Sequence, residues 1–173
     1  VEEEYARNGF FGRTAHLYRA NTPLAWTRIE GDLRPHALEL DRLEGLGGDY
    51  LAARIPFLSN ADVTLRRATL TAAMPYLFRN ADADEILFVH AGAGRLETDF
   101  GALDYRVGDY LVIPRGTVHR LLPAAETHLL VIESPGEVGF PDKGMLGQHA
   151  LWDPAVIDVP EPGPPTDDGR SEW

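Results

Sequence analysis

Cysteine is absent from this chain of 173 residues. Its absence excludes disulfide bonds and thiolate chemistry. A metal ion in this protein could be held only by nitrogen and oxygen ligands, which are imidazole, carboxylate and amide groups. The search for chemistry therefore falls on histidine, aspartate, glutamate and asparagine.

Basic residues and long apolar runs are also scarce. The chain has 16 Lys and Arg against 27 Asp and Glu, a net charge of -11. A protein of this sign does not neutralise phosphates, which excludes nucleic acid as a partner. No apolar run reaches the roughly 18 residues that a membrane span needs, and no signal-peptide pattern opens the chain. We therefore expect a cytoplasmic protein that does not contact a membrane.

Short alternating segments separated by turn residues dominate the sequence. Residues 63–70 and 127–133 alternate or carry dense apolar runs, and residues 80–120 form a meander with a glycine turn at Gly92 and a Pro114-Arg115-Gly116 corner. About eight short strands and few helical segments predict an all-β sandwich or barrel of the jelly-roll kind. Residues 50–58 and 71–78 are also predicted strands. The predicted core residues are Leu65, Leu70, Leu87, Val89, Leu111, Ile113, Leu130 and Ile132.

The two ends of the chain differ in amino-acid composition from its middle. Four prolines between positions 160 and 165 exclude a helix or a central strand there. We predict one domain in three parts: an amino-terminal arm with the first strands over 1–62, a barrel core over 63–135, and a carboxy-terminal arm and proline-rich linker over 136–173. Because the chain begins with Val1 and ends on Trp173 after a charged stretch, we expect a fragment of a longer protein.

Two motifs within residues 80–120 resemble those of the cupin superfamily. The first is Glu85-Ile86-Leu87-Phe88-Val89 with Gly92-Ala93-Gly94, and the second runs from Gly108-Asp109 through Ile113-Pro114 to His119. The resemblance implies a cupin-type jelly-roll β-barrel with extended arms and few short helices.

A narrower resemblance covers most of the chain. The segments at 16–19, 76–85, 96–101, 112–116 and 141–147 are similar to the amino-terminal half of homogentisate 1,2-dioxygenase, and the N-x-D-x-D and T-D-F-G pieces are the most specific. Members of that family are two-cupin enzymes that open an aromatic ring with Fe(II) and O₂. The resemblance implies that their iron lies in a carboxy-terminal cupin, which this chain does not contain. It implies a small aromatic acid as substrate of the parent enzyme, a carboxy-terminal cupin as partner and a homo-oligomer.

The candidate site residues are Asn80, Glu85 and His119. Cupins that bind a metal typically carry the ligand pattern H-x-H-x-x-x-x-E and a further histidine from the second motif. Aligned on Glu85, the first two histidine positions hold Phe78 and Asn80. One imidazole, one carboxylate and one amide could form a metal site in the barrel, although a non-haem iron centre uses two imidazoles and a carboxylate. Alternatively, Glu85 and His119 form a buried hydrogen-bonded pair.

Other polar residues are assigned structural roles. The Asn80–Asp84 segment is expected to be a turn in which side-chain oxygens accept backbone N–H groups. Arg115 is expected to be structural, with contact to a carboxylate substrate at the barrel mouth as the alternative. The remaining histidines are assigned to the surface: His16, His36, His90, His128 and His149.

Two functions follow from these observations. In the first, the chain is the amino-terminal cupin of a homogentisate 1,2-dioxygenase-type enzyme, acts mainly as scaffold and is inactive alone. In the second, it is a stand-alone cupin that binds a small molecule or a metal ion in the barrel.

Overall fold

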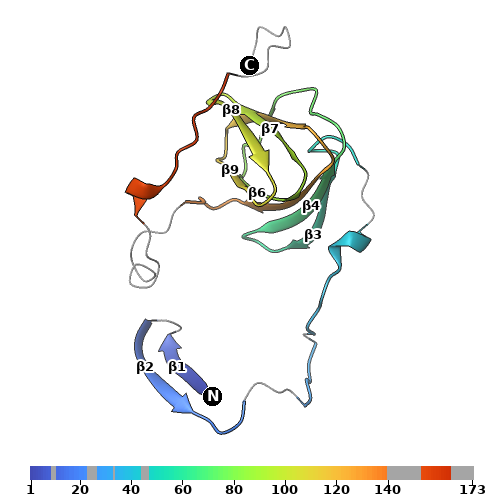
Figure 1. Ribbon diagram of the computed structural model, residues 1–173. Helices are drawn as coiled ribbons and strands as arrows, with labels where there is room; N and C mark the ends of the chain where they lie inside the picture. Colours follow the sequence, from blue (N-terminus) through green and yellow to red (C-terminus); the bar gives the residue numbers. More distant parts are fainter. Residues whose placement is uncertain (9–10, 23–26, 33, 44–46, 140–152, 165–173) are drawn as a thin grey trace. The chain divides into compact units, whose positions relative to one another are not determined.

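The computed structural model describes residues 1–8, 11–22, 27–32, 34–43, 47–139 and 153–164. The chain divides into two units, one made of Val1–Leu38 with Phe140–Val156 and the other of Glu39–Gly139 with Ile157–Trp173. Figure 1 shows a two-stranded hairpin in the first unit and two larger sheets in the second. Among the described residues, no helix is long and apolar enough to cross a membrane.

The first unit contains the antiparallel hairpin of β1 (Glu2–Asn8) and β2 (Phe11–Tyr18). Its ends are tied by ion pairs of Glu2 with His16 and of Glu3 with Arg19, each at 2.6 Å. β1 has no buried side chain. An isolated two-stranded hairpin is marginally stable in water, so this element does not supply a core of its own.

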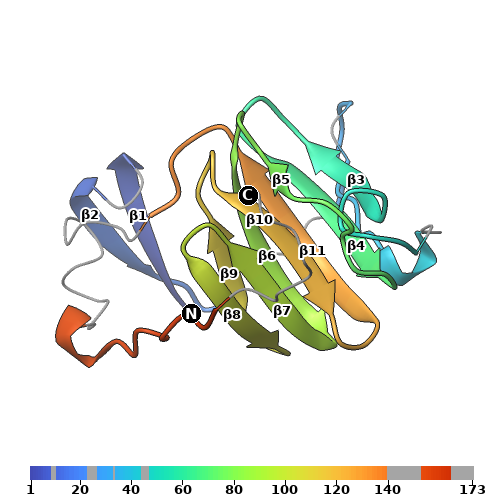
Figure 2. The same ribbon diagram turned by 90° about the horizontal axis from the view of Figure 1, so that it is seen from above.

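The second unit consists of two antiparallel sheets (Figures 1 and 2). One sheet has the strand order β5-β10-β7-β8 and the other has the order β3-β4-β11-β6-β9. The strands are β3 (Arg54–Ser59), β4 (Thr64–Leu70), β5 (Phe78–Arg79), β6 (Asp84–Ala91), β7 (Ala93–Thr98), β8 (Gly101–Arg106), β9 (Tyr110–Ile113), β10 (Val118–Pro123) and β11 (Thr127–Ser134). The short 3₁₀ helices η1 (Leu40–Arg42) and η2 (Pro154–Val156) complete the described elements. The predicted jelly roll with few short helices is confirmed.

The core lies between the two sheets and follows the period of two along each strand. Five of the predicted core residues are buried, namely Leu70, Leu87, Val89, Leu111 and Ile113. The prediction was wrong for Leu65, Leu130 and Ile132, which are half-buried. Leu129 and Val131 are buried instead. Since Leu130 pairs with Phe88 and Ile132 with Leu65 and Ile86, these side chains share the outer face of the five-stranded sheet.

The predicted strand over 71–78 is also wrong, because only Phe78 and Arg79 are in a strand. The backbone N–H of Thr71 donates to Gly48 and that of Met74 donates to Leu121, so this segment follows no single neighbouring strand. Pro75 has no N–H to contribute to a ladder.

The start of the predicted strand over 50–58 is a turn rather than a strand. The Asp49 carboxylate accepts the N–H groups of Leu51 and Ala52, each at 3.0 Å, and β3 begins only at Arg54. This turn places Tyr50 in the core with no exposed surface.

In the carboxy-terminal arm, the described residues 157–164 after η2 contain no helix, as the prolines there predict. Gly163 exchanges two backbone hydrogen bonds with Ala102, at 2.8 and 2.9 Å, and the Arg95 guanidinium donates to the Pro164 carbonyl at 2.6 Å. The arm therefore covers the free edge of β8, where unpaired backbone groups would otherwise face solvent.

Candidate functional site

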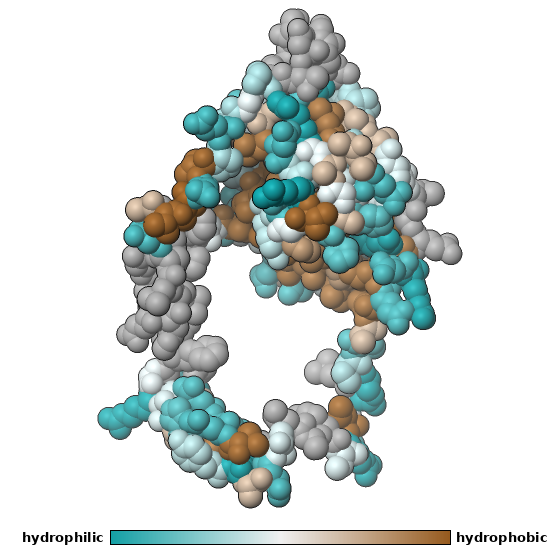
Figure 3. All heavy atoms as spheres, in the orientation of Figure 1, coloured by the Kyte–Doolittle hydropathy of each residue, from teal (hydrophilic) through white to brown (hydrophobic). Residues whose placement is uncertain are grey.

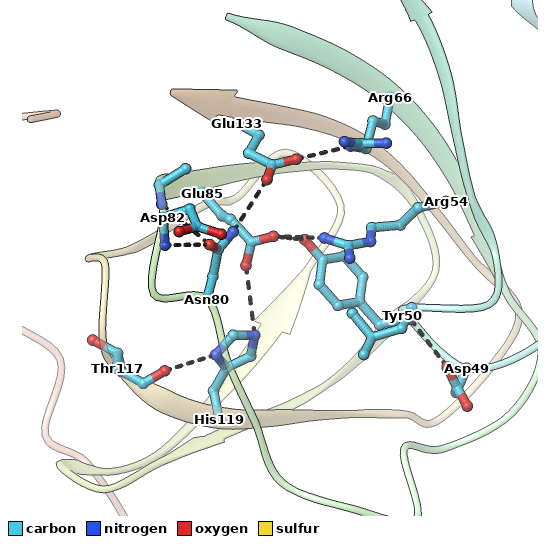
Figure 4. A network of polar contacts seen from close by, with 12 residues as sticks. Asp49, Tyr50, Arg54, Arg66, Asn80, Asp82, Glu85, Thr117, His119 and Glu133 are labelled. Atoms are coloured by element: carbon cyan, nitrogen blue, oxygen red, sulfur yellow. Dashed lines mark hydrogen bonds and ion pairs between the residues drawn. The ribbon is translucent and has the colours of Figure 1, made fainter. Parts of the chain in front are cut away.

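Glu85 and His119 meet in the interior of the barrel. Glu85 comes from β6 in the five-stranded sheet and His119 from β10 in the four-stranded sheet, and both side chains are fully buried. Tyr50 reaches them from the turn before β3, and Arg54 from the first position of β3 (Figure 4). Phe78 is the cross-strand partner of His119. The structure therefore brings together two of the three candidate residues.

The Glu85 carboxylate is held on one side by a cation and a hydroxyl. Its Oε1 accepts from Arg54 Nη1 at 2.7 Å and from the Tyr50 hydroxyl at 3.1 Å. The Arg54 guanidinium also lies over two aromatic rings, 4.8 Å from the centroid of Tyr50 and 5.7 Å from that of Phe78. Burial raises the pKa of the Tyr50 hydroxyl, and the adjacent Glu85 charge acts in the same direction. Tyr50 therefore stays a hydrogen-bond donor at neutral pH.

The orientation of His119 is set by the backbone. Its Nδ1 lies 3.1 Å from the Thr117 carbonyl oxygen. Because a carbonyl oxygen only accepts, Nδ1 carries the hydrogen, and Nε2 of the neutral ring presents a lone pair. The ring packs edge-on against Phe78, with centroids 5.5 Å apart.

The second oxygen of Glu85 faces this lone pair. Glu85 Oε2 and His119 Nε2 are 3.7 Å apart, and neither atom has a hydrogen-bond partner in the described part of the chain. The distance is too long for the direct hydrogen bond that the sequence suggested for this pair. Burial lowers the pKa of the His119 imidazole, with the Arg54 charge adding to it, while the Thr117 carbonyl and the Glu85 charge oppose the shift. Two acceptors therefore face each other when the ring is neutral, and the pair can take up a proton.

Asn80 serves a turn, and its hydrogen bonds to described residues do not include Glu85 or His119. Its Oδ1 accepts the N–H groups of Asp82 and Ala83 at 3.0 and 3.1 Å, which confirms the predicted turn. Its Nδ2 donates at 3.3 Å to Glu133, and Glu133 forms an ion pair with Arg66 at 2.8 Å (Figure 4). The side-chain amide is thus used in holding the turn to β11.

The residues present do not fit a divalent transition metal. Within the described ranges, no three His, Cys, Asp or Glu side chains converge as metal ligands. One imidazole and one carboxylate remain, and a guanidinium already neutralises the carboxylate. A second positive ion beside Arg54 would be repelled at this spacing. The three-residue metal site at Asn80, Glu85 and His119 stays a prediction that this geometry does not favour.

The corner that leads into β10 is fixed by a second acidic residue. Asp84 accepts the N–H of Arg115 and that of Val138, each at 2.8 Å, and these hydrogen bonds lower its pKa. Gly116 follows with a φ of 87°, a value that favours glycine, and its N–H donates to the Asn80 carbonyl. The Arg115 side chain reaches the Pro135 carbonyl at 3.4 Å, in agreement with a structural role.

Sequence reasoning missed Tyr50 and Arg54. Arg54 pairs with the buried Ala68 of β4, so its side chain is on the inward face of the sheet. A charged residue at an inward position of a strand was the feature of the sequence that could have identified it. A buried charge requires a partner, and an inward Arg54 together with an inward Glu85 could have suggested the pair.

Most of the remaining histidines follow the prediction of a surface position. His16, His36 and His90 are exposed, His128 is half-buried, and His149 lies outside the described residues. His16 is in a strand and pairs with Glu2, and His128 pairs with Glu126 at 2.9 Å.

Two antiparallel sheets that enclose a Glu and a His from facing strands define a cupin-type jelly roll. The chain matches the family described as homogentisate 1,2-dioxygenase N-terminal over residues 15–162. It belongs to that family.

Curated relatives agree with this assignment. A provisionally named dioxygenase from Saccharolobus solfataricus is 32% identical over 145 residues, which are 76% of this chain and 38% of the relative. The homogentisate 1,2-dioxygenase of Nitrobacter hamburgensis is 32% identical over 76 residues, or 43% of this chain and 17% of the relative. The chain therefore spans well under half the length of these relatives. The family match and the curated relatives agree on the family of this chain.

Solved structures are similar to about half of this chain. A cupin-2 domain containing protein from Shewanella frigidimarina has a TM-score of 0.45 and 18% identity, covering 51% of this chain and 84% of that chain. Salicylate 1,2-dioxygenase from Pseudoaminobacter salicylatoxidans has a TM-score of 0.44 and 19% identity, covering 48% of this chain and 25% of that chain.

Proposed function

We propose that this chain is the amino-terminal, scaffolding cupin of a homogentisate 1,2-dioxygenase-type enzyme. In this proposal Fe(II), O₂ and the small aromatic acid react in a second, carboxy-terminal cupin. The barrel described above stabilises that partner and the homo-oligomer and takes no part in the chemistry.

The ion pair between Arg54 and Glu85 carries the proposal. A catalytic iron needs open carboxylate and imidazole ligands, whereas this carboxylate accepts from a guanidinium at 2.7 Å. The position of a second imidazole is taken by Phe78, whose ring packs on His119. The barrel keeps the frame of a cupin site and fills it with a salt bridge and an aromatic ring.

The outer face of the five-stranded sheet supports a scaffolding role. It carries apolar side chains across all five strands, and Figure 3 shows such residues gathered along the lower side of this unit. Leu58 is 51% exposed, Val112 49% and Tyr110 64%. Half-buried apolar residues lie between them on the same face: Ile55, Leu65, Ile86 and Ile132. Exposed apolar patches of this kind mark protein interfaces, and a second cupin is the partner we propose.

Glu85→Gln in the product of the complete gene tests the proposal. A scaffolding barrel predicts a lower thermal midpoint, with iron per subunit and homogentisate turnover per folded enzyme unchanged. Loss of iron and of turnover in a variant that remains folded would assign Glu85 to the metal centre and contradict the proposal. Glu39→Gln, at an exposed ion pair, is the matched control, and it should change neither the thermal midpoint nor the iron content and turnover.

A second candidate function is a stand-alone cupin that binds a small molecule or a metal ion through Asn80, Glu85 and His119. The buried and unpartnered Glu85 Oε2 and His119 Nε2 favour it. Under this alternative, the purified chain binds a ligand stoichiometrically, and His119→Ala abolishes that binding.

A further inference from the structure

A hollow of about 300 Å³ lies on the outer face of the five-stranded sheet, separate from the barrel interior. Its apolar lining comes from Phe88 on β6 and from Leu129 and Leu130 on β11. Leu40 and Asp41, in the short helix η1, line it as well. Ligand sites of small molecules are hollows of this size, mostly apolar with a few placed polar groups.

The strand pairing opens this end of the sheet. His128 pairs with Ala91 while Leu129 pairs with Val89, so His90 of β6 is left without a partner in the ladder. This irregularity is a β-bulge, a feature that redirects side chains and occurs near binding sites. His90 and His128 both line the hollow as a result.

Arg67 is the only lining residue with a fixed positive charge, and the described part of the chain gives it no carboxylate. Its Nη1 donates to the Leu43 carbonyl at 2.5 Å, which uses one of five guanidinium N–H groups. The two other arginines of the same sheet face inward, and each has a carboxylate: Arg66 has Glu133 and Arg54 has Glu85. Arg67 is half-buried beside Leu130, its cross-strand partner. A partly desolvated guanidinium of this kind is suited to bind a carboxylate with two parallel hydrogen bonds.

We propose that this hollow binds a small monocarboxylate with an apolar body. The carboxylate bonds Arg67, the apolar body packs on Phe88 and Leu130, and an imidazole of His90 or His128 contributes a further hydrogen bond. The volume accommodates about ten non-hydrogen atoms, since a water molecule occupies ~30 Å³ in the liquid. Asp41 beside the hollow disfavours polyanions such as phosphates. This inference does not depend on the proposed function.

Titration of the chain with 4-methylbenzoate, followed by amide NMR, tests the proposal. The expected shifts are confined to β4, η1 and the adjoining ends of β6 and β11. The neutral isostere 4-methylbenzamide should bind about tenfold more weakly, because it lacks the charge-assisted hydrogen bonds to Arg67. Arg67→Gln should weaken binding of the acid by a similar factor and leave the amide unchanged, whereas Arg79→Gln, an exposed arginine on β5, should change neither.

The proposal is overturned by no shift at millimolar acid, by shifts centred elsewhere, or by equal affinity for the acid and the amide. Concentration-dependent shifts at the same residues without probe would also overturn it, because they would show a second copy of the chain covering the hollow. If Arg67→Gln does not fold, the comparison of acid and amide on the unmodified chain decides the matter alone.

Discussion

Replacing Arg54 with methionine removes the guanidinium that balances the buried Glu85 carboxylate. The Glu85 side chain is 0% exposed and that of Arg54 is 17% exposed. Removing one partner of a buried ion pair costs about 3–5 kcal/mol. We expect about 3 kcal/mol, the low end, because the Arg54 head keeps some contact with water and the Tyr50 hydroxyl still donates to Glu85. Urea unfolding of the chain at neutral pH measures this cost as a shift in midpoint.

Two further variants make the test specific. Arg42→Met is the matched control, since its ion pair with Glu39 is 81% and 69% exposed and should contribute about 0.5 kcal/mol or less. The double variant Arg54→Met/Glu85→Leu removes both charges and should recover most of the lost stability, because buried pairs and apolar replacements of similar volume are often close in free energy. Arg54→Met should lower the free energy of unfolding by more than Arg42→Met does. An equal or smaller loss, or a double variant less stable than both single variants, would contradict a buried ion pair between Arg54 and Glu85.

Three other predictions concern the frame of the barrel. Asp84→Asn should destabilise the chain by about 1–2 kcal/mol at neutral pH, because each Asp84 oxygen accepts one backbone N–H and the amide offers only one oxygen in their place. Since the pKa of Asp84 is lowered in the fold, its contribution is present above the unfolded pKa and is lost as pH falls through the folded pKa. Acid titration of stability should therefore be flatter in the variant, and parallel curves would contradict this. Gly92→Ala should cost several-fold more than Gly108→Ala, because both have positive φ but only at Gly92 would a Cβ meet a backbone oxygen, at 2.4 Å; equal thermal midpoints would contradict the clash. The double variant Phe78→His/Arg54→Met supplies a second imidazole and removes the competing cation. Calorimetry should therefore detect divalent metal binding that the unmodified chain lacks. If the variant gains no metal binding, Phe78 and Arg54 are not sufficient to explain why the site is closed to metal.

Periodicity predicted the sheets well where apolar and polar residues alternate. β4 was expected over 63–70 and lies at Thr64–Leu70. The four consecutive apolar residues of 129–132 carry no alternation, so which pair faces inward depends on the register with β4 and β6. That register is a tertiary property, and the choice of Leu130 and Ile132 as core was wrong for this reason.

The sequence identified only those site residues that lie within the two cupin-like motifs. Glu85 and His119 belong to the two motifs that resemble those of cupins, and both lie in the barrel interior. Arg54 lies 31 residues before Glu85, and Tyr50 lies 35 residues before it. No local pattern links residues at such separations. β4 and β11 lie between β3 and β6 in the sheet, and the side chains of Tyr50 and Arg54 meet Glu85 in the barrel interior.

Anaerobic titration of the purified chain with Fe(II), followed by removal of free metal and elemental analysis, tests whether Arg54 and Phe78 close its barrel to a catalytic metal. We expect no stoichiometric iron in the unmodified protein. One iron per chain that disappears in His119→Ala would contradict it.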